Sequence, residues 1–106
     1  DGLQLREAIL NLMVNAIQSM PEGGKLALFT DTDNTAVRIK VVDTGIGMSK
    51  EAQANLFTPF FTTKSRGLGL GLCITKTIIH EHSGSIQVFS ELGKGTTFIV
   101  SLPFIR

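Results

Sequence analysis

Two asparagines one helical turn apart are the first residues whose type and spacing suggest chemistry. Asn11 and Asn15 lie in a largely apolar segment, and Glu7 extends the polar stripe by one turn. Side chains four residues apart stack along one face of a helix. A buried amide without a partner costs roughly 1–3 kcal/mol, so the stripe faces solvent, an internal polar pair, or a ligand. Because amide oxygens are hard, uncharged ligands that suit Mg²⁺, a hydrated metal is one interpretation.

A carboxylate followed by two glycines is the second candidate. Asp43 ends a strand-like run, and Gly45 and Gly47 follow it in the pattern D-x-G-x-G. Glycine allows a positive φ or a close approach of the backbone to a ligand. A carboxylate accepts hydrogen bonds only and can therefore bind a donor such as an exocyclic amine. A simple Asx turn would give the same pattern, so both interpretations stay open.

Three glycines alternate with leucines from Gly67 to Leu72, directly before a predicted helix. The unpaired N–H groups and partial positive charge of a helix N-terminus suit phosphate. The G-x-G-x-G spacing differs from the dinucleotide-binding and P-loop patterns. A flexible linker is the alternative, although linkers favour Ser and Gly over Leu. The run therefore indicates either a phosphate-binding loop or a spacer.

The segment before this run combines a lysine with phenylalanines. Lys64, preceded by Thr63, can pair with a terminal phosphate as a compact charge, although a surface lysine is the usual case. We expect Phe57 to enter the core. Phe60 and Phe61 could pack on a loop or dock on a partner, because clustered exposed aromatic residues often mark an interaction site.

The remaining chemistry-bearing residues fit structural roles. The Thr96 hydroxyl follows a turn and could also bind a ligand. His80 and His82 fall near a helix C-terminus without a nucleophile or metal ligands beside them, and Cys73 is expected to be a packed thiol. The sequence has no Ser-His-Asp, H-E-x-x-H or C-x-x-C arrangement. We therefore expect no acid–base or nucleophilic catalytic residue.

Hydrophobic periodicity predicts the elements that position these residues. Apolar residues three and four apart predict a long first helix, and alternation predicts two hairpins. Ser49 is expected to cap a short helix, Gly84 to end a later one, and residues 31–34 to form the first hairpin turn. The predicted helices are 5–20, 49–56 and 67–82, and the predicted strands are 25–30, 37–42, 86–90 and 96–102.

This order of elements predicts an α+β fold, with helices on one face of a mixed sheet. The 106 residues suffice for one domain, and 42% hydrophobic content excludes a disordered tail. A net charge of +1 without charged blocks gives no reason to expect nucleic-acid or direct membrane contact. With one cysteine, no long apolar run and no signal peptide, we expect a cytoplasmic fragment of a longer protein, and membrane anchoring of that full-length protein stays open.

Taken in order, the motifs resemble the catalytic ATP-binding domain of sensor histidine kinases in the GHKL ATPase superfamily. They read N-L-x-x-N-A, D-x-G-x-G, a Phe-Pro-Phe tract, G-x-G-L-G-L and G-x-G-T-x-F, from Asn11 to Phe98. The stretch 56–64 is similar to the nitrogen-regulation type of kinase. The resemblance implies a two-layer GHKL/Bergerat-type fold, N-terminally shortened, with one domain over residues 1–106.

The resemblance also implies a set of ATP-binding residues. Asn15, assisted by Asn11, would coordinate Mg²⁺ on the triphosphate, and Asp43 would accept a hydrogen bond from the adenine amino group. Glycine amides would surround the phosphates, and Phe60 and Phe61 would be available for partner docking. The full ATP-binding set is Asn11, Asn15, Asp43, Gly45, Gly47, Met48, Thr63, Lys64, Gly67, Leu68, Gly69, Leu70, Gly71, Leu72 and Thr96.

Two departures from the wider superfamily affect the implied reaction. Hydrolysing relatives carry a glutamate base where this chain has Asn11, and an amide cannot take a proton from water. Many histidine kinases carry a basic residue near Gln18, so Lys64 or Arg66 must supply that contact. The resemblance thus implies phosphoryl donation to a histidine on a separate dimerisation domain, with a response regulator as the further partner.

Three alternatives to a histidine kinase catalytic domain remain open. The same superfamily includes hydrolysing ATPases and serine kinases of the anti-sigma type. A third alternative, of another class, is a degenerate module that binds a partner without nucleotide.

Overall fold

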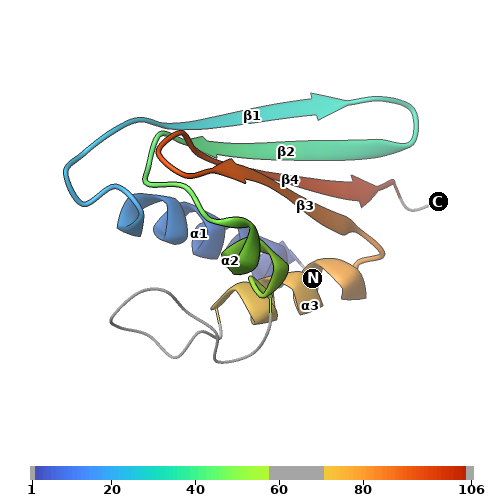
Figure 1. Cartoon of the computed structure of the whole chain (residues 1–106). Helices are drawn as coiled ribbons and strands as arrows, with labels where there is room; N and C mark the ends of the chain where they lie inside the picture. The colour runs from blue at the N-terminus through green and yellow to red at the C-terminus, as the bar shows by residue number, and fades with distance from the viewer. Residues whose placement is uncertain (1, 58–70, 105–106) are drawn as a thin grey trace.

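The structure is a computed structural model that describes residues 2–57 and 71–104. Three helices lie on one face of a four-stranded sheet and form two layers with it (Figure 1). The helices are α1 (Gly2–Gln18), α2 (Lys50–Ala54) and α3 (Gly71–Glu81); the strands are β1 (Leu26–Thr32), β2 (Ala36–Asp43), β3 (Ser85–Glu91) and β4 (Gly95–Pro103). The predicted α+β, two-layer fold is confirmed.

The sheet has the strand order β1-β2-β4-β3. Both pairs that are consecutive in sequence are hairpins, and β4 lies antiparallel beside β2 at the centre. The expected mixed sheet is therefore wrong for the described part of the chain, where every neighbouring pair is antiparallel. The reason is that the connection through α2 and α3 brings in a whole second hairpin, whose last strand meets β2 from the opposite direction.

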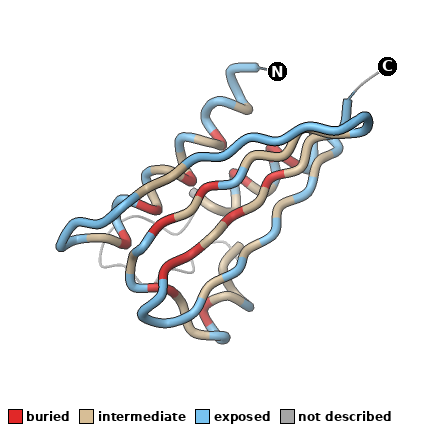
Figure 2. Tube along the Cα trace, turned by 90° about the horizontal axis from the view of Figure 1, so that it is seen from above, coloured by how far each residue is buried: buried red, intermediate tan, exposed pale blue. Residues whose placement is uncertain are grey.

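The core lies between the two central strands and the helices. Alternate residues of β2 and β4 point toward the helices, and Val41, Phe98 and Val100 are almost fully buried there. They meet Leu12 of α1 and Ile79 of α3, and Figure 2 shows buried positions along the inner strands and on the helices behind them. Burying each large apolar side chain contributes about 1.5–3 kcal/mol. This core fixes α1 and α3 against the two central strands.

The helix ends show one confirmed prediction and one correction. The Ser49 side chain caps α2 by accepting a hydrogen bond from Ala52 N, 3.1 Å away. At the end of α3, the left-handed residue is Ser83, with φ 62°, and not Gly84. Gly84 instead packs so closely against β4 that a Cβ would lie 2.5 Å from the Ser101 carbonyl oxygen. Position 84 therefore requires glycine because a side chain would not fit, and the left-handed backbone conformation is adopted by Ser83.

The first hairpin turn is shorter than expected. The sequence predicts Asp31 in the turn, but the residue pairs with Arg38 and so belongs to β1. The turn begins at Asp33, whose Oδ1 accepts hydrogen bonds from the backbone and hydroxyl of Thr35. In the second hairpin, Gly95 already pairs with Glu91 and belongs to β4. In both hairpins, strand pairing extends into residues that favour turns.

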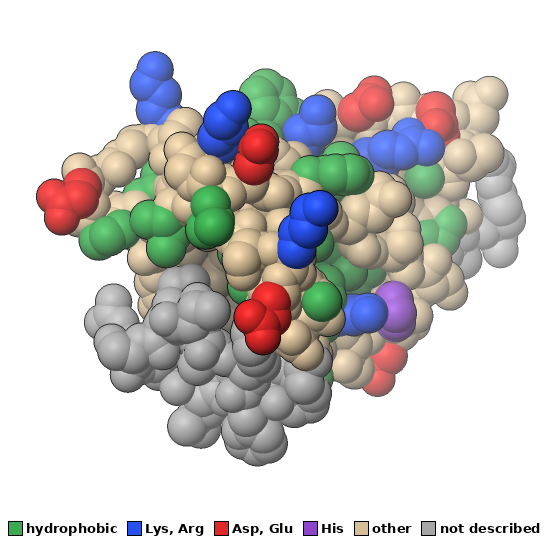
Figure 3. Space-filling model, viewed as in Figure 1, with side chains coloured by type: hydrophobic (Ala, Val, Ile, Leu, Met, Phe, Trp, Pro, Cys, Tyr) green, Lys and Arg blue, Asp and Glu red, His purple; other side chains and the backbone are tan. Residues whose placement is uncertain are grey.

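The molecular surface carries mixed charge. On the face shown in Figure 3, Lys and Arg side chains are interspersed with Asp and Glu side chains. This distribution agrees with the net charge of +1. Among the residues that the structure describes, none of the helices has the length and apolarity needed to cross a membrane.

Candidate functional site

A buried carboxylate ends β2 on the helix side of the sheet. Inward alternation along β2 places Asp43 on the same face as Val41, and the residue is only 3% exposed. Its Oδ1 accepts hydrogen bonds from Gly45 N at 2.8 Å and from Thr96 N at 3.2 Å. Within residues 2–57 and 71–104, the hydrogen bonds to this carboxylate all end on Oδ1. Oδ2 can therefore accept a hydrogen bond from a ligand.

The two glycines after Asp43 are required by packing against the protein. A Cβ at Gly45 would overlap the Ser19 side chain and carbonyl at the end of α1. Gly47 has φ +72°, and a Cβ there would overlap the Glu91 carbonyl. The loop 44–48 is thus held between α1 and the second hairpin. The expected close approach of these glycines to a base stays a prediction.

This loop connects the carboxylate to the asparagine helix. Ile46 N donates to the Ser19 carbonyl at 3.1 Å, and Ser19 N donates to the Asn15 carbonyl at 3.1 Å. Ser19 is buried, and its hydroxyl donates to Ala16 O at 2.7 Å. Because these bonds are short and consecutive, the turn of α1 that contains Asn15 is fixed relative to the Asp43 loop.

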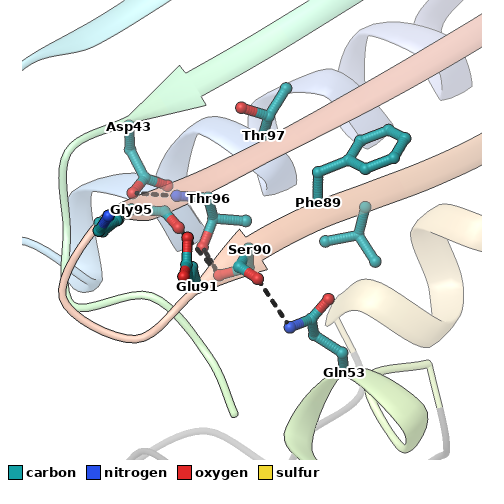
Figure 4. Close-up of a pocket in the computed structure, with 10 residues that line it drawn as sticks. Asp43, Gln53, Phe89, Ser90, Glu91, Gly95, Thr96 and Thr97 are labelled. Carbon is teal, nitrogen blue, oxygen red and sulfur yellow. Dashed lines mark hydrogen bonds between the residues drawn. The ribbon is translucent and has the colours of Figure 1, made fainter. Parts of the chain in front are cut away.

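A hydroxyl network joins the second hairpin to the same loop (Figure 4). Ser90 Oγ accepts from Met48 N at 2.8 Å, donates to Gly95 O at 2.9 Å and lies 2.8 Å from Thr96 Oγ1. From α2, Gln53 Nε2 donates to Ser90 O at 3.0 Å and to Met48 O at 3.2 Å. The network therefore fastens α2, the loop and the hairpin at one point.

A cavity of about 410 Å³ opens beside this network. Polar acceptors from Asp43, Ser90 and Thr96 share it with apolar surface, a combination typical of sites for small organic ligands. A second cavity of about 350 Å³ adjoins Met48 and shares Gln53, Ser90 and Glu91 with the first. The first is lined by Asp43, Gln53, Val88, Phe89, Ser90, Glu91, Lys94, Gly95, Thr96 and Thr97.

The structure brings some predicted site residues together. Asp43 and Thr96 are paired directly across β2 and β4, and both line the first cavity. Met48 lines the second. Asn11 and Asn15 are half-buried on α1 and are not among the described residues that line either cavity. Their link to the site is the hydrogen-bonded path through Ser19.

Other predicted residues lie at the start of α3 or outside the described chain. Gly71 begins α3, and Leu72 packs against the hydrophobic core. Phe57 packs against the same core, as expected, and Lys76 Nζ lies 5.1 Å from the centroid of its ring. The predictions for Phe60, Phe61, Thr63, Lys64, Gly67, Leu68, Gly69 and Leu70 fall outside the described residues.

Sequence reasoning missed Ser90 and Gln53. A signal for Ser90 was present, because Ile86, Val88 and Ser90 share one side of β3 and the first two are apolar. A hydroxyl at the third inward position needs a buried partner. Gln53 carried no such signal, since its role depends on how α2 lies against β3.

The described residues suit a metal ion that arrives with its ligand. They contain no group of three or more His, Cys, Asp or Glu side chains able to hold a metal ion. The half-buried amides of Asn11 and Asn15 are neutral oxygen donors. Mg²⁺ is commonly bound by one or two protein oxygens together with substrate phosphates. The residues present therefore fit a magnesium ion carried by a polyphosphate.

Comparison with known proteins gives concordant matches in sequence and structure. The family model described as "Histidine kinase-, DNA gyrase B-, and HSP90-like ATPase" matches residues 1–106. Sporulation kinase E of Bacillus subtilis (strain 168) is 46% identical over 101 residues, which are 94% of this chain and 14% of that kinase. The chain thus spans a small part of this relative's length.

Solved structures of histidine kinases share the fold. The mycobacterial sensor histidine kinase MprB superposes with a TM-score of 0.87 at 28% identity, covering 97% of this chain and 74% of that one. Full-length ShkA, solved in complex with AMPPNP, gives a TM-score of 0.84 at 34% identity, covering 95% of this chain and 21% of that one. The described architecture is therefore one that kinases of this type adopt.

Proposed function

Because the chain belongs to the family of histidine kinase-, DNA gyrase B- and HSP90-like ATPases, we propose that it binds Mg-ATP and donates the γ-phosphoryl group to a protein histidine. The acceptor histidine belongs to a separate dimerisation and phosphotransfer domain, and a response regulator takes the phosphoryl group from there. The similarity to sporulation kinase E and to MprB supports a place in two-component signalling. The AMPPNP complex of ShkA supports ATP as the nucleotide.

The single observation that carries the proposal is the buried Asp43 beside a cavity. Its Oδ1 is held by Gly45 N and Thr96 N, so the carboxylate is fixed before any ligand arrives. Its second oxygen faces no described donor and suits the amino group of adenine. A pre-organised acceptor of this kind gives affinity without the entropic cost of ordering a flexible side chain.

Asn15 and Asn11 are the residues that would hold magnesium on the triphosphate. When bound there, the ion would supply positive charge that offsets the negative charge developing on the phosphates during transfer. The path from Asn15 through Ser19 to Ile46 N fixes the metal-binding turn of α1 relative to Asp43. The base-binding and metal-binding parts of the chain are thereby held in one fixed arrangement, and such positioning of the reacting groups lowers the barrier to transfer.

Asn11 directs the proposed reaction away from hydrolysis. It stands one turn before Asn15 and cannot act as a general base toward water. The imidazole of an acceptor histidine is itself a nucleophile and does not need a base from this chain. The described residues therefore act by binding and orienting ATP.

Transfer to a supplied histidine domain tests the proposal. The chain is incubated with Mg²⁺ and γ-labelled ATP beside the dimerisation domain of the kinase that contains it. We expect acid-labile, base-stable label on that domain, lost when its acceptor histidine is replaced by glutamine. Acid-stable label would indicate a serine kinase, and steady phosphate release without protein labelling would indicate a hydrolysing ATPase. Either result would overturn the proposal.

A further inference from the structure

Ser90 is not among the site residues predicted from the sequence, yet several hydrogen bonds of the site meet at it. It lies on the inner side of β3, and its Oγ has three polar neighbours between 2.8 and 2.9 Å away. Its own carbonyl accepts from Gln53 Nε2, as Figure 4 shows. Ser90 is thus held through both its backbone and its side chain, which is more than a strand residue needs for pairing.

Counting protons fixes the direction of each hydrogen bond around Ser90 Oγ. Met48 N is a donor, so Ser90 accepts from it. Gly95 O has no proton, so the 2.9 Å contact is a hydrogen bond only when Ser90 donates. The proton of Ser90 is then used, and the Thr96 hydroxyl must donate to Ser90. The reverse direction would leave one fewer hydrogen bond in this part-buried network.

The consequence falls on Thr96, which lines the cavity with Asp43. A hydroxyl whose proton is directed at Ser90 presents lone pairs alone to a ligand. The Asp43 carboxylate also accepts only, and the Thr96 amide is bonded to it at 3.2 Å. This corner of the cavity therefore presents acceptors from two neighbouring strands.

We propose that Ser90 is a positioning residue for base selection, which orients the Thr96 hydroxyl as an acceptor and so favours an amino-purine over an oxo-purine. The proposal rests on the proposed function, that a nucleotide occupies this site. The 6-amino group of adenine donates toward acceptors, whereas the 6-oxo group of guanine meets their lone pairs. Without the Ser90 hydroxyl, Thr96 is free to rotate and to donate, and the penalty against guanine falls.

The test compares the affinities for Mg-ATP and Mg-GTP, measured calorimetrically on the whole chain. In Ser90→Ala, the ratio of ATP to GTP affinity falls between roughly twofold and tenfold, the range for one hydrogen bond. Ser90→Thr keeps the hydroxyl and retains the ratio. Ser85→Ala is the matched control, because Ser85 lies exposed on the same strand. An equal loss of affinity for both nucleotides indicates a structural role and overturns the proposal.

A double-mutant cycle with Thr96→Val tests whether Ser90 acts through Thr96. In the Thr96→Val background, Ser90→Ala is expected to change the ratio no further. If Ser90→Ala gives no cooperative melt, Thr96→Val alone carries the test, and an unchanged ratio overturns the proposal. Absence of ATP binding by the unaltered chain refutes the proposed function. If the chain binds ATP but the ratio of ATP to GTP affinity does not change in Ser90→Ala, only this inference is refuted.

Discussion

An aspartate with its own hydrogen-bond network lies near each end of β2: Asp33 in the turn just before the strand, and Asp43 as its last residue. Among the described residues, the side chain of Asp33 bonds only to partners within five residues, including Thr35 and Arg38. Asp43, at the buried end, bonds to Thr96, 53 residues away. The neighbouring bonds from Met48 and Gln53 to Ser90 span 42 and 37 residues.

The short-range network of Asp33 stabilises one turn, whereas the long-range network of Asp43 assembles the candidate site. The Asp33 network closes on itself, so it forms whenever the turn forms. The Asp43 network exists only when two hairpins, α2 and the end of α1 have all come together. Asp43 and Thr96 are buried, and Gln53 and Ser90 are half-buried, so the loss of one partner leaves a polar group unsatisfied away from water. We therefore expect substitutions at the Asp43 end to change both stability and binding.

The largest effect is expected for Asp43→Ala. It removes an ionised acceptor from the buried N–H groups of Gly45 and Thr96, and each such bond contributes about 1.5–3 kcal/mol. Stability falls by roughly 3–6 kcal/mol in total, and Mg-ATP affinity falls by at least about tenfold. Thermal unfolding and calorimetry measure both. Asp31→Ala, on exposed β1, is the control and is expected to change neither.

Two glycine-to-alanine changes sharpen the comparison, one in the loop after Asp43 and one in the turn of the second hairpin. Gly47 and Gly93 both have positive φ, at 72° and 79°. A Cβ at Gly47 would overlap the Glu91 carbonyl, whereas at Gly93 it meets nothing within 4 Å. We expect Gly93→Ala to cost about 1–2 kcal/mol for backbone strain alone. Gly47→Ala is expected to cost on the order of 3 kcal/mol; equal costs would show that packing of the loop is unimportant.

A smaller effect is expected at the cap of α2. Ser49→Ala removes the side-chain acceptor for Ala52 N and costs about 1 kcal/mol of stability. Because α2 carries Gln53, which bonds to Ser90 O, loosening the helix also weakens Mg-ATP binding slightly. Ser49→Asp preserves a capping acceptor and is expected to restore both. A loss that Ser49→Asp does not restore would contradict the capping role.

The smallest effect is expected at Asp33, in the exposed turn that precedes β2. Hydrogen bonds, led by that from the Thr35 hydroxyl, hold the pKa of Asp33 far below its ordinary value. A pKa that is lower in the folded state than in the unfolded state stabilises the protein at pH values above the unfolded pKa of about 3.9. This stabilisation is lost as the pH falls toward the folded-state pKa. Asp33→Asn therefore lowers the melting temperature slightly at pH 7, and the gap narrows below about pH 4. Nucleotide affinity is unchanged; a change would show that the two ends are coupled.

The same comparison shows how far the sequence predicts the molecule. The two hairpins, the long first helix and the Ser49 cap follow from periodicity and local turn chemistry, and all are present. The pairing of Asp43 with Thr96 was not derivable from periodicity, because the strand order depends on how the second hairpin joins the first. The resemblance to kinases supplied both residues without supplying their contact.

The errors in the prediction have a common physical cause. Residue type alone predicts that the first turn begins at Asp31 and that Gly84 ends α3, whereas Asp31 is paired in β1 and the left-handed residue is Ser83. In each case a tertiary or cross-strand contact decided the outcome. The role of Gln53 was not predictable for the same reason, because its amide reaches Ser90 only when α2 is packed against β3.

Calorimetric titration of the chain with Mg-ATP, run in parallel on Asp43→Asn, tests the central claim most directly. The account predicts one saturable site in the unaltered chain, and a loss of affinity in Asp43→Asn, whose amide keeps one acceptor but loses the charge. No heat of binding in the folded, unaltered chain, or equal affinity in the two proteins, would contradict it.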